Sequence, residues 1–386
     1  MTRSRQLSFF DSQRLRLDGA IELSLASLAE YGQRYRHWAV AYSGGKDSSA
    51  TVTLVAWAIK TGRLPAPESL TVLYADTRME LPPLQQTAME LLTELQDDGF
   101  NVQVVLPEMD KRFFVYMLGY GVPPPSNTFR WCTGQIKVKP MEAALMEMRE
   151  RSGEKFLMIT GVRMGESAQR DQRIAISCSR DSGECGQGWF QTMANDAIAD
   201  TLAPLLHWRL CHVYDWLYFD TLGHGYDVSG IAQVYGEADV RTGCVGCNLV
   251  GRDTSLLRLL QCPEWPHLRP LLRLRPLYRE LKKPQRRKRK AEPERRKDGR
   301  WSKNVQRMGP LTIEAREYGL GCVLDIQACA GVDLINAEEE ARIREMWALD
   351  MWPRKWTSGD ADATMAVDAL ALDGAGEIVT QALLIH

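Results

Sequence analysis

The stretch Tyr42-Ser43-Gly44-Gly45-Lys46-Asp47-Ser48-Ser49 lies between an apolar run and a segment with helical periodicity. The apolar run, His37 to Tyr42, predicts a buried strand, and Asp47 to Lys60 predicts a helix. Two adjacent glycines allow the backbone to approach a ligand closely, and the helix N-terminus offers unpaired N–H donors to an anion. The stretch therefore predicts a phosphate-binding loop. A turn that only caps the helix is the alternative.

The flanking sequence repeats this alternation of strand and helix. Strand-like runs occur at 70–75, 102–106 and 156–160, and helical patterns at 82–95 and 139–150. Strands separated by helices of this length indicate a parallel sheet with crossover helices. We therefore expect an α/β fold, a doubly wound and mostly parallel sheet, with a C-terminal cysteine-bearing and basic extension. We also expect the loops at 121–128 and 178–188 to follow strands at the carboxyl edge of the sheet.

The length and composition are those of a globular protein. With 386 residues, 45% hydrophobic and 25% charged, the chain is long enough for two domains. We divide it into a phosphate-loop domain at 1–235, a cysteine-bearing and basic helical region at 236–350, and a loosely ordered tail at 351–386. No apolar run has the length of a membrane span or signal peptide, so we expect a cytoplasmic protein without membrane partners.

Positive charge is concentrated in one segment. Between Arg273 and Arg307 there are 16 Lys or Arg residues and 4 Asp or Glu residues, although the whole chain has a net charge of −1. We call residues 273–307 the basic segment. It predicts either contact with a polyanion such as nucleic acid or a solvated linker.

Nine cysteines are too few and too irregularly spaced for a secreted disulfide scaffold. Cys244-Val245-Gly246-Cys247 is a C-x-x-C on a glycine-containing loop, a spacing that suits one metal or cluster edge, or a redox dithiol. A structural zinc site would need a second nearby pair, and no histidine is close enough in sequence to complete one.

The stretch from Ser43 to Ser48 resembles the PP-loop of ATP pyrophosphatases, a superfamily that includes sulfonucleotide reductases, tRNA thiolation enzymes and DNA phosphorothioation enzymes. Two further elements resemble that superfamily: Asp76-Thr77 with Glu80, and Gly161-Val162-Arg163 with Glu166, Ser167 and Arg170. The resemblance implies that ATP, with Mg²⁺, is split between its α and β phosphates. It implies a site of Ser43, Gly44, Gly45, Lys46, Asp47, Ser48, Asp76, Thr77, Gly161 and Arg163, in which Lys46, Asp47 and Arg163 are catalytic.

A second resemblance concerns the cysteines. Phe129-Arg130-Trp131-Cys132-Thr133, followed by Lys137, Lys139 and Pro140, is similar to the R-C-C…K-x-x-P region of cluster-bearing adenylosulfate reductases, except that Trp131 replaces one cysteine. The similarity implies a 4Fe-4S cluster held by Cys132, Cys185, Cys244 and Cys247, with Cys262 as an alternative to Cys185. Cys178 would be a spare thiol able to carry a persulfide.

The whole pattern resembles DNA phosphorothioation sulfurtransferases of the DndC and SspD type. Sulfonucleotide reductases carry a C-terminal Glu-Cys-Gly-x-His, whereas this sequence ends Thr380-Gln-Ala-Leu-Leu-Ile-His386, so we do not expect a reductase. The resemblance implies adenylation of a DNA backbone phosphate and insertion of sulfur, with a cysteine desulfurase as donor and other phosphorothioation subunits as partners. A tRNA-thiolating enzyme, or a non-catalytic nucleotide-sensing subunit that binds DNA, are the alternatives.

Overall fold

The computed structural model describes residues 15–165, 171–172, 183–184, 189–191, 197–236, 242–295, 298–301, 306–362 and 370–380. It divides into two compact units. The first contains Met1–Asp76, Pro82–Val105 and Met141–Thr242, and the second contains Thr77–Leu81, Leu106–Pro140 and Gly243–His386. The units therefore interleave along the chain, whereas the division expected from the sequence was linear. No helix among the described residues is long and apolar enough to cross a membrane.

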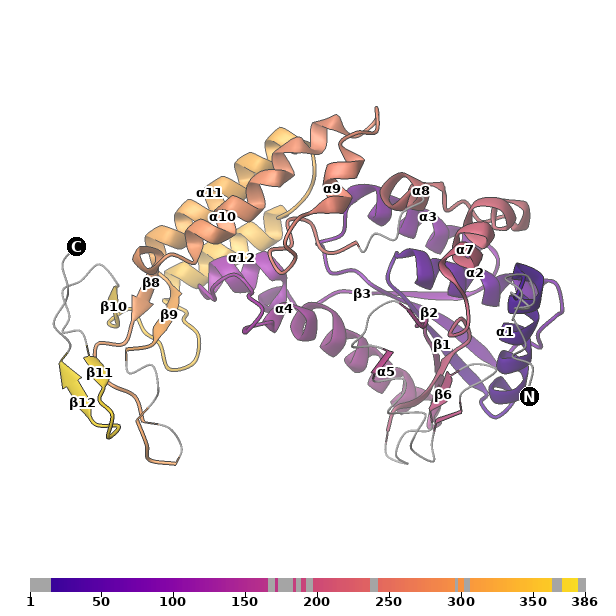
Figure 1. The fold of residues 1–386 in the computed structure, drawn as a ribbon, viewed down its shortest axis with the longest axis horizontal. Coiled ribbons are helices and arrows are strands. Elements are labelled where there is room, and N and C mark those ends of the chain that lie inside the picture. The colour runs from indigo at the N-terminus through magenta and orange to yellow at the C-terminus, as the bar shows by residue number, and fades with distance from the viewer. Residues whose placement is uncertain are drawn as a thin grey trace, which may run out of the picture. The chain divides into compact units, whose positions relative to one another are not determined.

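The first unit is built on a seven-stranded sheet with the order β3-β2-β1-β4-β7-β6-β5 (Figure 1). Strands β1 to β4 and β7 are parallel, and β5 and β6 form an antiparallel edge. The bounds are β1 His37–Tyr42, β2 Ser69–Ala75, β3 Asn101–Val105, β4 Phe156–Ile159, β5 Gly183–Glu184, β6 Trp189–Gln191 and β7 Ala199–Ala203. The expected α/β class with a mostly parallel sheet is thus confirmed.

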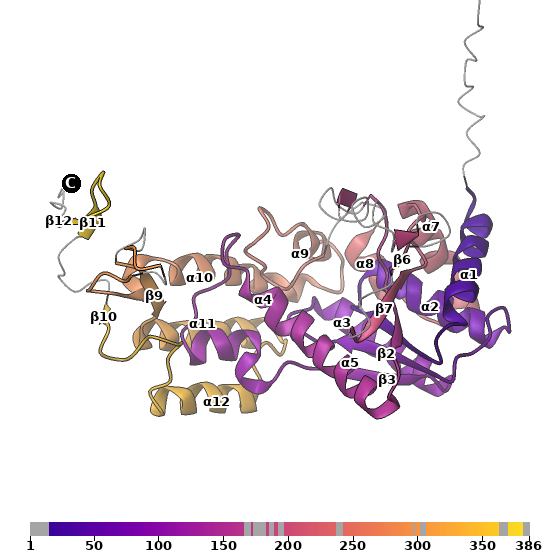
Figure 2. The same cartoon turned by 90° about the horizontal axis from the view of Figure 1, so that it is seen from below.

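Helices cover both faces of this sheet, as a doubly wound fold requires. Helix α5 (Lys139–Ser152) packs Ala144, Leu145 and Met148 against one face, while α2 (Lys46–Lys60) and α3 (Pro82–Asp97) lie on the other (Figures 1 and 2). The remaining helices of the unit are α1 Leu17–Gly32, α7 Leu210–Asp215, η4 Trp216–Asp220, η5 Leu222–His224 and α8 Ser229–Tyr235.

The strand order reverses at β1. Successive strands β1, β2 and β3 run in one direction across the sheet, and β4 returns to the other side of β1. The loops that follow β1 and β4 therefore leave the carboxyl edge of the sheet side by side. Open α/β folds bind ligands at such a switch point.

The second unit is mainly helical. Helices α10 (Leu274–Leu281) and α11 (Ile313–Ala330) pack side by side (Figure 1). The other helices are η1 Met109–Lys111, η2 Val115–Gly119, α4 Trp131–Thr133, η3 Gly134–Val138, α9 Thr254–Leu259, η6 Pro266–Arg273, η7 Pro284–Arg286 and α12 Ala337–Ala348. The strands are β8 Arg287–Arg289, β9 Met308–Leu311 and β10 Ala361–Asp362 in one sheet, and β11 Leu370–Leu372 with β12 Ile378–Thr380 in another.

Arg316 of α11 fixes the loop that precedes Cys132. Its side chain is fully buried and donates hydrogen bonds to the carbonyl oxygens of Gly119 and Leu311, at 2.8 and 3.3 Å. Gly121 has a φ of +79°, and a Cβ there would collide with the guanidinium. The loop at 121–128 thus follows η2 within the long connection from β3 to α5, and its expected place at the carboxyl edge of the sheet stays a prediction. The loop at 178–188 lies, apart from 183–184, outside the described residues.

Candidate functional site

The loop from Ser43 to Ser48, which we call the phosphate loop, joins β1 to the N-terminus of α2. Ser43 N–H donates to Ser48 Oγ at 3.2 Å, and the two hydroxyls are 3.0 Å apart, so the loop closes on itself. Gly44 has a φ of +69°, a conformation that favours glycine. The N-cap of α2 is Gly45, and no described side chain caps the helix. The first N–H groups of α2 are therefore positioned for an anion.

The loop after β4 meets the same helix end. A Cβ on Gly161 would lie 2.8 Å from Asp47 O and 2.9 Å from Ser48 N, so only glycine permits this approach. Arg163, which is 5% exposed, donates from Nε to Asp47 Oδ1 at 3.0 Å. Lys46 Nζ lies 3.3 Å from Asp47 Oδ2. The elements expected to form one site are thus together, with Asp47 between the two cations.

Tyr235, at the end of α8, lies against Lys46 and Gly45 of the phosphate loop. Lys46 Nζ lies 4.8 Å from the centre of the Tyr235 ring, and a Cβ on Gly45 would be 3.2 Å from the hydroxyl. That hydroxyl shares a hydrogen bond of 2.5 Å with Thr242 Oγ1. The ring face therefore shields and orients the Lys46 ammonium through a cation–π contact. Nothing in the sequence pattern singled out Tyr235, because it is far from the loop along the chain.

Asp76 and Thr77, expected as one nucleotide-binding element, belong to different units. Asp76 is 8% exposed at the end of β2, and its N–H donates to Val105 O at 3.1 Å. Thr77 is 4% exposed and donates from Oγ1 to Glu80 Oε1 at 2.7 Å. Asp76 thus shares the unit of the phosphate loop, whereas Thr77 shares the unit of the cysteines. Nucleotide contact by either residue stays a prediction.

In the second unit, the C-x-x-C loop packs against residues 77–81 and α10. Val245 N–H donates to Met79 O at 2.6 Å. Gly246 has a φ of +64°, and a Cβ there would lie 2.6 Å from the Cβ of Leu274. The glycine of this motif is therefore required by both its backbone conformation and its contact with α10.

Cys132 lies in α4, next to an aromatic group. The ring of Trp131 stacks on Phe113 with centroids 5.3 Å apart, and Phe113 lies 6.0 Å from the ring of Tyr278. The tryptophan that replaces a cysteine of the R-C-C pattern thus packs in an apolar cluster.

Three of the four expected cluster ligands influence one another electrostatically. Burial, the Glu80 carboxylate, and the Cys247 and Cys132 thiols raise the pKa of Cys244 to about 12. Burial also raises the pKa of Cys132, and Cys247 adds to the effect. We call Cys132, Cys244 and Cys247 the cysteine site. Cys185 and Cys178 lie outside the described residues, and Cys262 is half-buried just after α9.

The donor type of the cysteine site is that of an iron–sulfur cluster, because thiolates are the usual ligands of such clusters. Among the described residues, no group of three His, Cys, Asp or Glu side chains is placed to hold a metal ion. Tyr278 Oη is also buried without a described hydrogen-bond partner. The donor type and the unpaired hydroxyl therefore suit a sulfur-containing group.

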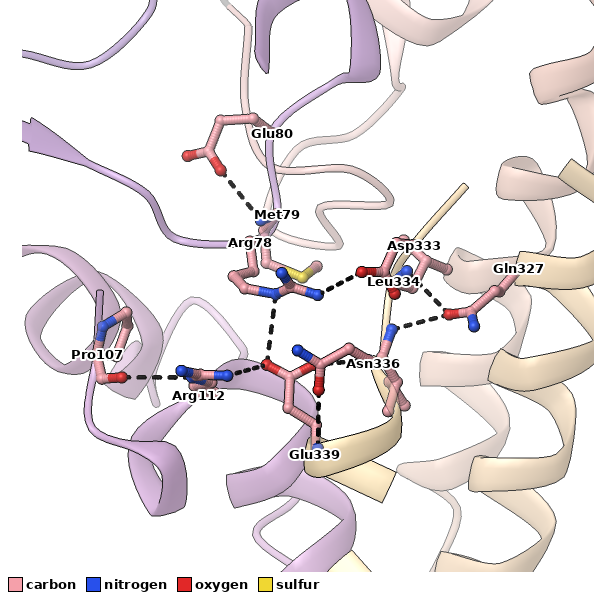
Figure 3. Close-up of polar contacts among 11 residues, drawn as sticks. Arg78, Met79, Glu80, Pro107, Arg112, Gln327, Asp333, Leu334, Asn336 and Glu339 are labelled. Atoms are coloured by element: carbon pink, nitrogen blue, oxygen red, sulfur yellow. Dashed lines mark hydrogen bonds and ion pairs between the residues drawn. The ribbon is translucent and has the colours of Figure 1, made fainter. Parts of the chain in front are cut away.

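A polar network anchors the segment that supports the cysteine site (Figure 3). Arg78, with a left-handed φ of 58°, contacts Asp333 Oδ2 at 2.9 Å and Glu339 Oε1 at 3.4 Å. Arg112 Nη1 donates to the same Glu339 oxygen at 3.1 Å. Glu339 also forms a capping box with Asn336 at the start of α12. These contacts hold residues 77–81 in a backbone conformation that would otherwise be costly.

Much of the basic segment is folded rather than a solvated linker. It contains α10, η7 and β8, and several of its cations have partners within the protein. Lys288 is 5% exposed and donates to Ser358 O at 3.0 Å and Asp360 O at 2.9 Å. Arg279, Lys283, Arg295 and Arg300 are exposed. The linker interpretation is therefore wrong for α10 to β8, and polyanion contact stays a prediction for the exposed cations.

Comparison with known proteins relates this arrangement to a family. The family model described as the phosphoadenosine phosphosulfate reductase domain matches residues 37–245. Similar solved structures include phosphoadenylyl-sulfate reductase from Candida auris in a phosphate complex (10% identity, 52% of this chain and 83% of that chain, TM-score 0.31). Another is the U34-tRNA thiolase NcsA from Methanococcus maripaludis with its 4Fe-4S cluster (14% identity, 55% of this chain and 66% of that chain, TM-score 0.36). A third is an FMN adenylyltransferase mutant from Candida glabrata (16% identity, 53% of this chain and 56% of that chain, TM-score 0.33). A search of curated proteins found no match.

Proposed function

Because the chain belongs to the phosphoadenosine phosphosulfate reductase domain family, we propose that it is an ATP pyrophosphatase that activates a nucleic-acid phosphate for sulfur transfer. The proposal rests on one observation. The uncapped N-terminus of α2 lies at the switch point of the sheet, together with buried Lys46 and Arg163. This combination suits a polyphosphate whose charge grows during bond cleavage.

In this proposal, the α2 N–H groups and the serine hydroxyls of the phosphate loop bind the phosphates of ATP, with Mg²⁺ bound to them. Lys46 neutralises charge on the departing pyrophosphate. Asp47 contacts both Lys46 and Arg163, so it holds the two cations in place rather than accepting a proton. An acceptor oxygen attacks the α-phosphate, and pyrophosphate leaves. The acceptor is then adenylated, and a sulfur nucleophile displaces AMP.

The cysteine site supports sulfur chemistry in this scheme. Cys132, Cys244 and Cys247, with Cys185, would hold a 4Fe-4S cluster, which supplies iron able to bind the delivered sulfur. Burial raises the pKa values of the Cys132 and Cys244 thiols, which favours their protonated form while the site is empty. A cysteine desulfurase would be the donor of sulfur.

We propose the DNA backbone as the acceptor and other phosphorothioation subunits as partners. The exposed cations of the basic segment suit contact with phosphates, which is sequence-independent and sensitive to salt. Buried cations of the basic segment, such as Lys288, have partners within the protein and cannot contact DNA. We therefore expect DNA binding to depend on salt less strongly than the full charge of the basic segment would predict.

The test combines purified, anaerobically prepared protein with ATP, cysteine, a cysteine desulfurase and either DNA or tRNA. We expect AMP and pyrophosphate in equal amounts, and sulfur in the DNA backbone detected by nuclease digestion and mass spectrometry. Asp47→Ala should abolish turnover, whereas Asp97→Ala, at the far end of α3, should not.

Other outcomes identify other functions. Release of ADP and phosphate would refute the pyrophosphatase proposal. Sulfur in tRNA bases would identify a tRNA-thiolating enzyme, and binding of ATP and DNA without turnover would identify a sensing subunit. Reduction of phosphoadenosine phosphosulfate to sulfite in the presence of a thiol reductant would identify a reductase.

A further inference from the structure

Tyr278 of α10 carries a buried hydroxyl that the proposed reaction does not use. The residue is 1% exposed, and no described residue lies within hydrogen-bonding distance of its Oη. Most buried side-chain hydroxyls in proteins have a partner, so an exception calls for an explanation. A phenylalanine would fill the same apolar space without leaving a polar atom unpaired.

Tyr278 lies near both of the segments that carry the three cysteines. Leu274, one turn earlier on the same face of α10, packs against Gly246 in the C-x-x-C loop. On its other side, the Tyr278 ring contacts Phe113, which stacks on Trp131 beside Cys132. The ring therefore lies where the segments that carry the three cysteines approach each other.

The phenol of Tyr278 can act only as a donor towards an anion, because an ordinary phenol keeps its proton at neutral pH. A protonated phenol can donate one hydrogen bond. When the site carries negative charge on sulfur, that donor is the complementary group.

We propose that Tyr278 Oη donates a hydrogen bond to an anionic sulfur held at the cysteine site, and is therefore a positioning residue for it. This inference rests on the proposed sulfur chemistry. The sulfur is either a sulfide of the cluster or a persulfide on one cysteine, and both are acceptors of the same kind. A donor to such a sulfur stabilises the more negative state, so it raises the reduction potential of a cluster and lowers the nucleophilicity of a persulfide anion.

The test compares Tyr278→Phe with Tyr116→Phe in the full chain. Tyr116 is a matched control because it is half-buried beside Trp131, and burial alone raises its pKa. In one arm, each protein is reconstituted with iron and sulfide, and its midpoint potential is measured. In the other arm, iron-free protein is charged with a cysteine desulfurase and cysteine. The rate at which iodoacetamide alkylates the persulfide anion, with iodide as the leaving group, is then measured. Thermal unfolding of each empty protein is recorded in parallel.

We expect Tyr278→Phe to be as stable as the wild type, or more stable, when the site is empty, because it removes an unpaired hydroxyl. When the site is loaded, we expect Tyr278→Phe to show a more negative potential or an alkylation of the persulfide that is at least about threefold faster, while Tyr116→Phe matches the wild type. A change in the first arm alone identifies a cluster sulfide, and a change in the second alone identifies a persulfide.

Equal behaviour of Tyr278→Phe and the wild type in both arms would overturn the inference and leave the proposed function intact. If wild-type protein takes up neither iron nor sulfur, the proposed sulfur chemistry fails and this inference fails with it. The two failures are distinguishable because the second is seen in the wild type before any variant is made.

Discussion

Gly161→Ala is the substitution that most directly tests the arrangement of the nucleotide site. The added Cβ would lie 2.8 Å from Asp47 O, 2.9 Å from Asp47 C and 2.9 Å from Ser48 N. All three atoms belong to the backbone of the first turn of α2, which cannot rotate away. The loop that carries Arg163 must therefore move away from the helix.

The size of the effect follows from the distances. Restoring ordinary contact requires a shift of about 0.6 Å, since 3.4 Å is the start of the ordinary van der Waals range. A shift of this size would lengthen the Arg163–Asp47 hydrogen bond, now 3.0 Å, beyond the usual limit. Overpacking costs about 1–3 kcal/mol, which corresponds to roughly a 5- to 150-fold loss in kcat/KM if the cost falls on the transition state.

The assay measures ATP affinity by calorimetry and pyrophosphate release by a coupled enzyme. Gly223→Ala is the control, because no atom lies within 4 Å of the added Cβ in that case. We expect Gly161→Ala to lose turnover and Gly223→Ala to retain it. If Gly161→Ala binds and turns over ATP like the control, the close approach of the two loops does not position the catalytic groups.

Three further predictions concern the second unit. Lys288→Met should lower the stability of the fold by about 1 kcal/mol, because it removes the hydrogen bonds that a buried ammonium donates to the carbonyl oxygens of Ser358 and Asp360, yet it should not change the salt dependence of DNA binding. Glu339→Gln should destabilise the protein by about 3 kcal/mol, because two arginines lose a buried partner. In iron-free protein at pH 7, Cys244 should react slowly with iodoacetamide, and the rate should rise with pH towards its pKa of about 12, because only the thiolate reacts.

Each of these predictions has a control in the same unit. Lys283→Met changes an exposed lysine paired only with Glu280, and a loss of stability equal to that of Lys288→Met would contradict the structural role. Glu345→Gln removes a carboxylate whose side chain is 56% exposed, and urea unfolding should barely respond to it. Exposed Cys329 should react with iodoacetamide before Cys244, as mass spectrometry can show, and faster labelling of Cys244 would refute the effect of burial.

The sheet could be predicted because its strands are short apolar runs flanked by helical patterns. The run at 37–42 coincides with β1, and 102–106 lies within one residue of β3. Strand β7 was not predicted, because Ala199–Ala203 contains Asp200 and Thr201 among its five residues and has no continuous apolar run. Pairing with β4 and the contacts of Asp200 with Tyr35 and Lys155 stabilise it, and a local pattern contains neither.

The candidate site was predictable where function depends on backbone geometry. Gly44 and Gly161 were recognisable because close approach requires glycine at those positions. Tyr235 and Tyr278 were not recognisable as site residues, because each acts through contacts with segments far away in the sequence. Thr77, which the resemblance placed at the nucleotide together with Asp76, donates its hydroxyl to Glu80, and its contact with a nucleotide stays a prediction.

The interleaving of the two units has a consequence for biosynthesis. Arg78 is synthesised 255 residues before its partner Asp333, and Glu339 follows shortly after Asp333. At about 5–20 residues per second, roughly 15–50 seconds separate their synthesis. Throughout that interval the segments at 77–81 and 106–140 lack the helices on which they pack. The segment that carries Cys132 therefore cannot complete its packing before α11 and α12 have been synthesised.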